Sequence, residues 1–188
     1  MTFSFIEKSI LTIVNYCCLM KKTDLESNQV KKNLIDVFEQ VKSTVSFQEQ
    51  RSRAGLMLGL QELGSTQEEF IGAYYPIASN IIVMNKTPLR RILETKVELL
   101  QPYSFHILLH EYLHSLGFLD EEITQYKTYT ISKKQFGKDH IITQLSAHIQ
   151  HFFPYLTYPT LGWTPPENAS AIELVKGFDS SHLQMYIT

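Results

Sequence analysis

The sequence predicts an α+β fold, and three observations carry that prediction. Short runs rich in β-branched and aromatic residues lie between residues 54 and 85, separated by turn-forming residues, which is typical of strands. On both sides of them, apolar residues recur at helical spacing over long stretches. Helices and strands thus occupy separate parts of the chain instead of alternating, which favours α+β.

The N-terminal half is expected to hold two helices and a small sheet. Helical periodicity covers residues 5–21 and 28–45. The apolar segment 54–63 contains two glycines and favours a strand. Residues 70–75 and 81–85 flank turn formers and predict a hairpin or two neighbouring strands.

The C-terminal half is expected to be mainly helical. Pro88 can open a helix that covers 89–100, and Pro102 is expected to break it. A second helix should run over 104–116 and stop at Gly117, a residue that favours helix ends. Further helices are expected over 121–135, 139–153 and 169–176.

Length, charge and cysteine usage narrow the class of protein. With 188 residues, 44% hydrophobic, the chain can form one domain with its own core, so we expect a single domain over residues 1–188. A net charge of -2 gives no basic field for nucleic acid. Cys17 and Cys18 are adjacent, which disfavours a mutual disulfide and a zinc knuckle and fits a reducing, cytoplasmic compartment. The apolar run 9–20 is too short to span a bilayer and is read as a buried helix.

The motif H-E-x-x-H-x-x-G-x-x-D spans residues 110–120. Residues four apart lie one above the other on a helix, so His110 and His114 can reach one metal ion. Zinc accepts imidazole nitrogens at about 2.0–2.1 Å, and a catalytic site combines three protein ligands with a position for water. Glu111 follows the first histidine and can take a proton from that water. The motif therefore predicts Zn²⁺ on both histidines, with Glu111 as general base.

Asp120 is the expected third ligand. In a continuous helix it would lie about 9 Å beyond His114 along the axis, too far to share an ion. Gly117 tolerates the left-handed conformation that ends a helix, and such a turn can carry the Asp120 carboxylate back to the metal.

Coincidence accounts poorly for a motif of this length. In a chain with seven histidines, a chance H-E-x-x-H arises roughly once in sixty cases, and roughly once in ten thousand when the glycine and the acid are also required. The competing interpretation is an amphipathic helix that carries two surface histidines.

These eleven residues resemble the zincin metallopeptidases. The glycine and the following acid are similar to the metzincin branch and to small single-domain zincin-like proteins with an H-E-x-x-H-x-x-G-x-x-D-E pattern. The likeness covers about residues 54–122 and implies an upper part, 1–116, with the sheet and the motif helix, above a mostly helical lower part, 117–188. It also implies that a strand of the preceding hairpin aligns an extended peptide.

Two features depart from that pattern. Metzincins carry a methionine turn beneath the metal, whereas here the downstream methionine is Met185, which is expected to pack, although Tyr186 beside it could approach the site. Zincins of the glutamate branch take their third ligand from a downstream helix, so other acids could replace Asp120. These are Glu121, Glu122, Glu167 and Glu173.

Other histidines and tyrosines are weaker candidates. His106 shares the helical stripe of His110 but lies about 12 Å from His114 along the axis, so it can only orient a ligand or fill the core. His148 and His151 stand three residues apart among aromatic residues, which favours packing over metal binding. Four residues are candidates for stabilising an oxyanion, with nothing to rank them: His140, His182, Tyr126 and Tyr186.

The expected function is hydrolysis of peptide bonds by a zinc metallopeptidase. We expect a peptide or protein substrate, no nucleic acid and no membrane partner, and the sequence does not fix the oligomeric state. The alternative is a non-catalytic zinc-binding or protein-interaction protein on a zincin scaffold. A structural zinc is held by four protein ligands, and the motif supplies three, which favours the enzyme.

Overall fold

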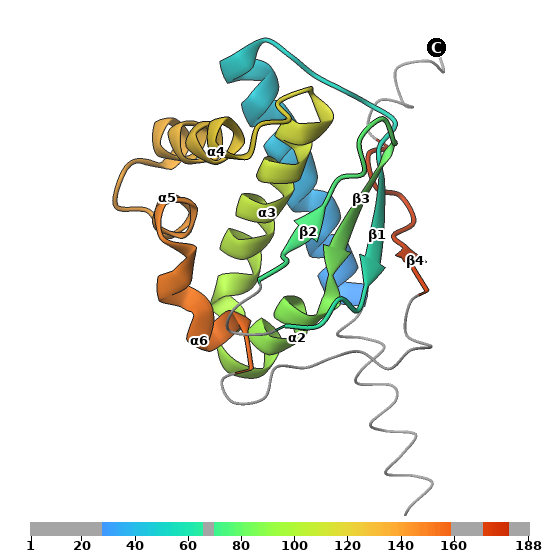
Figure 1. Ribbon diagram of the computed structural model, residues 1–188, viewed down its shortest axis with the longest axis vertical. Coiled ribbons are helices and arrows are strands. Elements are labelled where there is room, and N and C mark those ends of the chain that lie inside the picture. Colours follow the sequence, from blue (N-terminus) through green and yellow to red (C-terminus); the bar gives the residue numbers. More distant parts are fainter. Residues whose placement is uncertain (1–27, 66–69, 159–170, 181–188) are drawn as a thin grey trace, which may run out of the picture. The chain divides into compact units, whose positions relative to one another are not determined.

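The structure is a computed structural model that describes residues 28–65, 70–158 and 171–180 (Figure 1). The chain divides into two compact units, Met1–Leu34 and Ile35–Thr188. Helices and a small sheet make up the described residues, as α+β predicts. The predicted helix 5–21, with Cys17 and Cys18, lies outside them. None of the helices in the described ranges is long and apolar enough to cross a membrane.

A four-stranded mixed sheet forms one layer of the second unit, in the order β2-β3-β1-β4. Strand β1 (Met57–Gln61) pairs in parallel with β3 (Ile81–Asn85), with Gly59 opposite Val83. Strand β2 (Ala73–Tyr74) runs antiparallel to β3 and forms one edge of the sheet. The strand predicted within 54–63 and the hairpin predicted at 70–75 and 81–85 are both confirmed.

The last predicted helix, 169–176, is wrong over its described residues. Glu173 and Leu174 form the short strand β4, antiparallel to β1, and the Val175 amide donates to the Leu58 carbonyl at 2.9 Å. An isolated helix of eight residues is marginal in water, whereas the free edge of β1 offers ready backbone partners. The chain after Gly117 is therefore not helical throughout.

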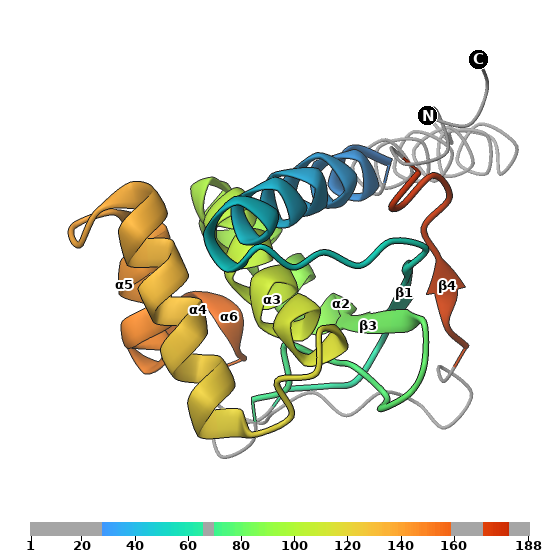
Figure 2. The ribbon, with the colours of Figure 1, turned by 90° about the horizontal axis from the view of Figure 1, so that it is seen from above.

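Helix α3 (Leu100–Ser115) lies between the sheet on one side and α4, α5 and α6 on the other (Figures 1 and 2). Almost all of its residues are buried, including Tyr103, Phe105 and Tyr112, none of which is exposed at all. The predicted break at Pro102 is wrong. Pro102 is the third residue of α3, in the first turn, where amides have no intrahelical partner and a missing N–H costs nothing.

The remaining helices follow the predicted order with shifted ends. The predicted helix 28–45 is confirmed and extends to residue 49. Helix α4 (Glu121–Phe136) matches 121–135 and ends at Gly137. The segment 139–153 is broken at His148 into α5 (Ile141–Ala147), the 3-10 helix η2 (Ile149–Phe152) and α6 (Phe153–Leu156). The segment 89–100 likewise divides into α2 (Lys86–Thr95) and the 3-10 helix η1 (Val97–Leu99).

Asn85 ties these elements together at the end of β3. Its side chain is fully buried, and both of its amide atoms make two hydrogen bonds. The oxygen accepts from the amides of Leu63 at 3.1 Å and Thr87 at 3.0 Å, the latter as the N-cap of α2. The nitrogen donates to the carbonyls of Gly64 and Ile71, each at 2.8 Å. One side chain thus fixes the ends of β1 and β3, the start of α2 and the chain that enters β2.

We predict that Asn85→Ala lowers the free energy of unfolding by about 3 kcal/mol, because it removes a helix cap and leaves buried backbone groups unpaired. Urea denaturation followed by circular dichroism measures this. The control is Asn80→Ala in the β2–β3 turn, an exposed asparagine, where a change within about 0.5 kcal/mol is expected. Equal losses in both variants would contradict the role assigned to Asn85.

Candidate metal centre

The polar end of α3 carries the motif histidines. His110 and His114 lie on the same face, with ring centroids 4.7 Å apart. Their side chains are mostly buried, at 12% and 15% exposure. Most other residues of α3 are apolar and buried, so this face is the part of the helix that presents metal-binding side chains.

The chain reverses directly after α3. Gly117 has φ +97°, a conformation that favours glycine, and the Phe118 amide returns to the Leu113 carbonyl at 3.2 Å. Asp120 then caps α4, because its carboxylate accepts from the Ile123 amide at 2.9 Å. The first residue of α4 is Glu121, and the reversal brings its side chain to the histidines.

Three ligand atoms gather at this point: His110 Nε2, His114 Nε2 and the Glu121 carboxylate, all within 4.8 Å of one another. The two Nε2 atoms are 3.0 Å apart, and the carboxylate oxygens lie 3.0 Å from His110 Nε2 and 3.2 Å from His114 Nε2. Ligands of a tetrahedral zinc ion lie about 3.3 Å from one another. The donor set and its spacing therefore fit Zn²⁺.

Hydrogen bonds prepare both histidines for a metal. His114 Nδ1 lies 2.7 Å from the Phe118 carbonyl, an acceptor, so Nδ1 carries the proton and Nε2 keeps its lone pair. The Gln125 side chain, one turn beyond Glu121 on α4, hydrogen-bonds to the His110 ring. Burial also lowers the pKa of His110, which favours the neutral ring that metal binding needs.

Glu111 lies beside this cluster in an unusual state for a carboxylate. It is 6% exposed, and its Oε2 has no hydrogen-bond partner among the described residues. Burial, with a smaller contribution from the Glu121 carboxylate, raises the pKa of Glu111 to about 8, and a hydrogen bond from the Tyr75 backbone opposes this. A divalent cation on the three ligand atoms would lower this pKa again, because opposite charge favours the ionised form.

Asp120, the predicted third ligand, is not part of the cluster, whose carboxylate comes from Glu121. The reason is the helix cap, because the Asp120 carboxylate accepts a hydrogen bond from the amide of Ile123, three residues further along the chain. The sequence carries a signal for this assignment, because Asp directly before a helical pattern is a preferred N-cap, and the next residue then begins the helix.

The other acidic alternatives lie elsewhere or outside the described residues. Glu122 is exposed on α4. Glu173 on β4 pairs with Lys86, with 2.6 Å between the Lys86 Nζ and the carboxylate. Glu167, and with it His182, Met185 and Tyr186, falls outside the described residues.

The remaining histidine and tyrosine candidates have separate positions. His106 is buried, with Nδ1 3.0 Å from the Ser146 Oγ. His140 caps α5, accepting from the Ile142 amide at 3.2 Å. The exposed pair His148 and His151 has ring centroids 5.1 Å apart and belongs to no metal-binding group found in the described ranges. Tyr126 is 69% exposed on α4.

Arg53 is a residue that the sequence did not point to. Its guanidinium donates to the Tyr75 hydroxyl and the Ser79 carbonyl, each at 2.6 Å, and to the Ser115 carbonyl at 2.9 Å. It thereby joins the β2–β3 turn to the C-terminal end of α3. Because the Tyr75 backbone contacts Glu111, Arg53 helps to fix the surroundings of that carboxylate.

Two small cavities flank the cluster, and both are lined by Ala73, His110, Glu111 and Glu121. One, of about 290 Å³, continues past Tyr75 and Ile77 after β2. The other, of about 280 Å³, continues past Phe70 and Gly72 before β2. The cluster of His110, His114 and Glu121 therefore lies between two cavities, one lined by residues after β2 and the other by residues before it.

No known protein-family model, curated protein or solved structure matches this chain. Its function is therefore inferred from its residues and their geometry.

We predict that Glu121→Gln weakens zinc binding by more than about 100-fold, because loss of a ligand should exceed the effect of losing a ligand's hydrogen-bond partner. Asp120→Ser is the matched variant: serine keeps the N-cap acceptor but is not a carboxylate, so we expect a change of less than about tenfold. Competition with a chromogenic chelator measures both affinities. The reverse ranking would assign the third ligand to Asp120.

Proposed function

We propose that this chain is a zinc-dependent peptidase of the zincin type, in which His110, His114 and Glu121 hold the metal and Glu111 is the general base. The observation that carries the proposal is the unpaired, buried Oε2 of Glu111 beside three converging ligand atoms. Leaving a buried carboxylate oxygen unpaired costs free energy, and such groups are typical of catalytic sites.

The donor set supports a catalytic zinc. Three protein ligands leave a position for water, whereas closed structural sites use four. A zinc ion bound there would polarise the substrate carbonyl and acidify a water molecule. Glu111 would accept a proton from the attacking water and pass it to the leaving nitrogen. A bound cation would lower the raised pKa of Glu111 and favour the ionised carboxylate, which is the form that accepts a proton.

The cavities support a peptide substrate that is cleaved at an internal bond and not at its end. Cavities lie on both sides of the cluster, so a chain could continue past the scissile bond in both directions. Strand β2 lines these cavities as an edge strand and could hydrogen-bond an extended peptide by strand addition. We therefore propose endopeptidase activity.

The second candidate is a zinc-binding protein without catalysis. It would share the ligands but have no use for the unpaired oxygen of Glu111, which favours the enzyme. The third candidate is a protein-interaction domain without metal. The zinc content of the purified protein distinguishes it from the other two candidates, because it would bind no zinc.

We predict that Glu111→Gln keeps about one zinc per chain but lowers kcat by at least about 100-fold, because general-base catalysis contributes about 10²–10⁴-fold. The measurement is cleavage of a quenched-fluorescence peptide library, with zinc content determined by elemental analysis. Glu98→Gln is the control: Glu98 is an exposed acid in the first turn of η1, and no change is expected.

Two results would change the assignment. Full activity in Glu111→Gln would remove Glu111 from the mechanism. A zinc-loaded wild-type protein that cleaves no peptide in the library would favour the non-catalytic zinc-binding protein.

A further inference from the structure

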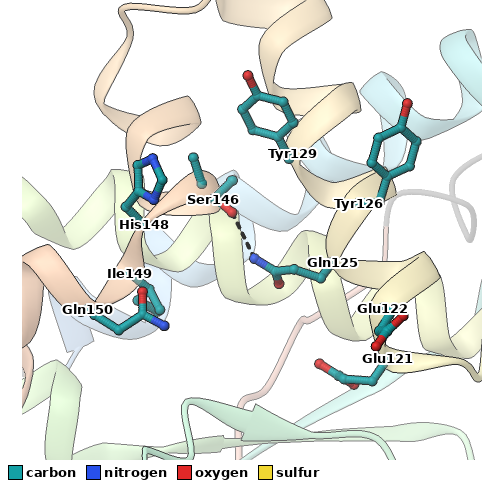
Figure 3. Close-up of a pocket in the computed structure, with 10 residues that line it drawn as sticks. Glu121, Glu122, Gln125, Tyr126, Tyr129, Ser146, His148, Ile149 and Gln150 are labelled. Atoms are coloured by element: carbon teal, nitrogen blue, oxygen red, sulfur yellow. Dashed lines mark hydrogen bonds between the residues drawn. The ribbon is translucent and has the colours of Figure 1, made fainter.

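A larger groove lies beside the metal centre, between α4 and the end of α5 with η2. It encloses about 810 Å³. Figure 3 shows Gln125 reaching across it from α4, and the Gln125 Nε2 donates to the Ser146 carbonyl at 2.7 Å. The walls of this α4–α5 groove include Glu122, Tyr126 and Tyr129 on α4 and Ala147, His148 and Gln150 on the other side.

The groove is continuous in its lining with a cavity at the cluster. Glu121, Gln125 and Ile149 line both the groove and the cavity on the Phe70 side of the cluster. A peptide bound at the cluster beside Glu111 would therefore lie next to the groove, with the Gln125 and Ile149 side chains at the border between the two pockets. The volume of the groove is large enough for a long side chain, and Glu121 lines both the groove and the cavities at the cluster.

The charges of the groove are acidic. Glu121 and Glu122 line it, and no lysine or arginine does so in the part of the chain that the structure describes. Glu121 is committed to the metal cluster, whereas Glu122 forms no ion pair with any described residue. Tyr126 and Tyr129 add aromatic rings, and Lys133 Nζ already lies 5.6 Å from the centroid of the Tyr129 ring. Because Lys133 already occupies the Tyr129 ring, the groove offers a substrate cation the Glu122 carboxylate and the Tyr126 ring.

His106, which lines the cavity beside the groove, does not oppose a cation. Ser146 Oγ donates to the Ile142 carbonyl at 2.9 Å, so its single proton is used, and His106 Nδ1 must donate to it. His106 Nε2 is then an acceptor on a ring that is 4% exposed and lines the connecting cavity. Burial lowers the pKa of His106 to about 3, so the ring stays neutral. His148 is exposed on the opposite wall of the groove from α4.

We propose that the α4–α5 groove is a specificity subsite that takes a basic side chain, lysine or arginine, of a peptide substrate. The apolar stem lies against Ile149, and the charged head lies near the Glu122 carboxylate and the Tyr126 ring. Lysine and arginine heads carry only hydrogen-bond donors, which match the acceptors available there. This inference rests on the proposed peptidase function.

The test uses the zinc-loaded protein and pairs of quenched-fluorescence peptides that differ only in lysine or norleucine at one position. The substitution is moved through the positions on both sides of the scissile bond. At one position we expect kcat/KM to favour lysine by about fivefold, the upper range for exposed charge pairs. Glu122→Gln should remove most of that preference while leaving kcat/KM for the norleucine peptide unchanged. Glu98→Gln is the control for loss of an exposed acid and should keep the preference.

Affinity measured by fluorescence anisotropy on the Glu111→Gln protein separates this inference from the proposed function. If no peptide is cleaved, the peptidase proposal fails, yet tighter binding of lysine peptides that depends on Glu122 would still support the groove as a cation subsite. Cleavage without a lysine preference at any position, or with a preference that Glu122→Gln keeps, would overturn the inference.

Discussion

The cluster of His110, His114 and Glu121 depends on one reversal of the chain, the turn from Ser115 to Asp120 that joins α3 to α4. Without it, Glu121 would lie far along the axis from the histidines. The positive φ of Gly117 makes the turn possible, and the Phe118 carbonyl within it accepts from His114 Nδ1 at 2.7 Å. The same carbonyl lies 2.8 Å from the Thr124 hydroxyl of α4. One short segment therefore brings the ligands together and fixes the tautomer of one of them.

The burial of α3 gives this cluster its electrostatic character. Because α3 is surrounded by the sheet and by other helices, Glu111 and His110 are held away from water. Burial raises the pKa of Glu111 and lowers the pKa of His110, and both shifts favour the neutral form. Such a site lacks the solvent that would otherwise stabilise charge, so a bound cation would have a large effect on it. Arg53 adds rigidity by joining the β2–β3 turn to the end of α3.

Helix α4 links the ligands to the surface that we assign to substrate. Its first turn supplies Glu121, its second supplies Gln125 against the His110 ring, and its outer face carries Tyr126 and Tyr129 in the groove. Gln125 also donates to the Ser146 carbonyl, so the same side chain joins α4 to α5 and contacts the His110 ring. In the proposed enzyme, substrate in the groove would contact the helix that holds the third ligand.

The sequence by itself determined what depends on local spacing. His110, Glu111 and His114 fall together because helical periodicity places residues four apart on one face, and Gly117 marks the helix end through its own backbone freedom. The short β-prone runs predicted β1, β2 and β3 because strand preference is expressed within a few residues. Only the tertiary structure decided the rest. The reversal between α3 and α4 brought the Glu121 carboxylate to the two histidines, while the Asp120 carboxylate capped α4. Strand β4 formed because the edge of β1, distant in sequence, lay close enough to pair. Both outcomes depend on how the chain folds back on itself, which periodicity does not record.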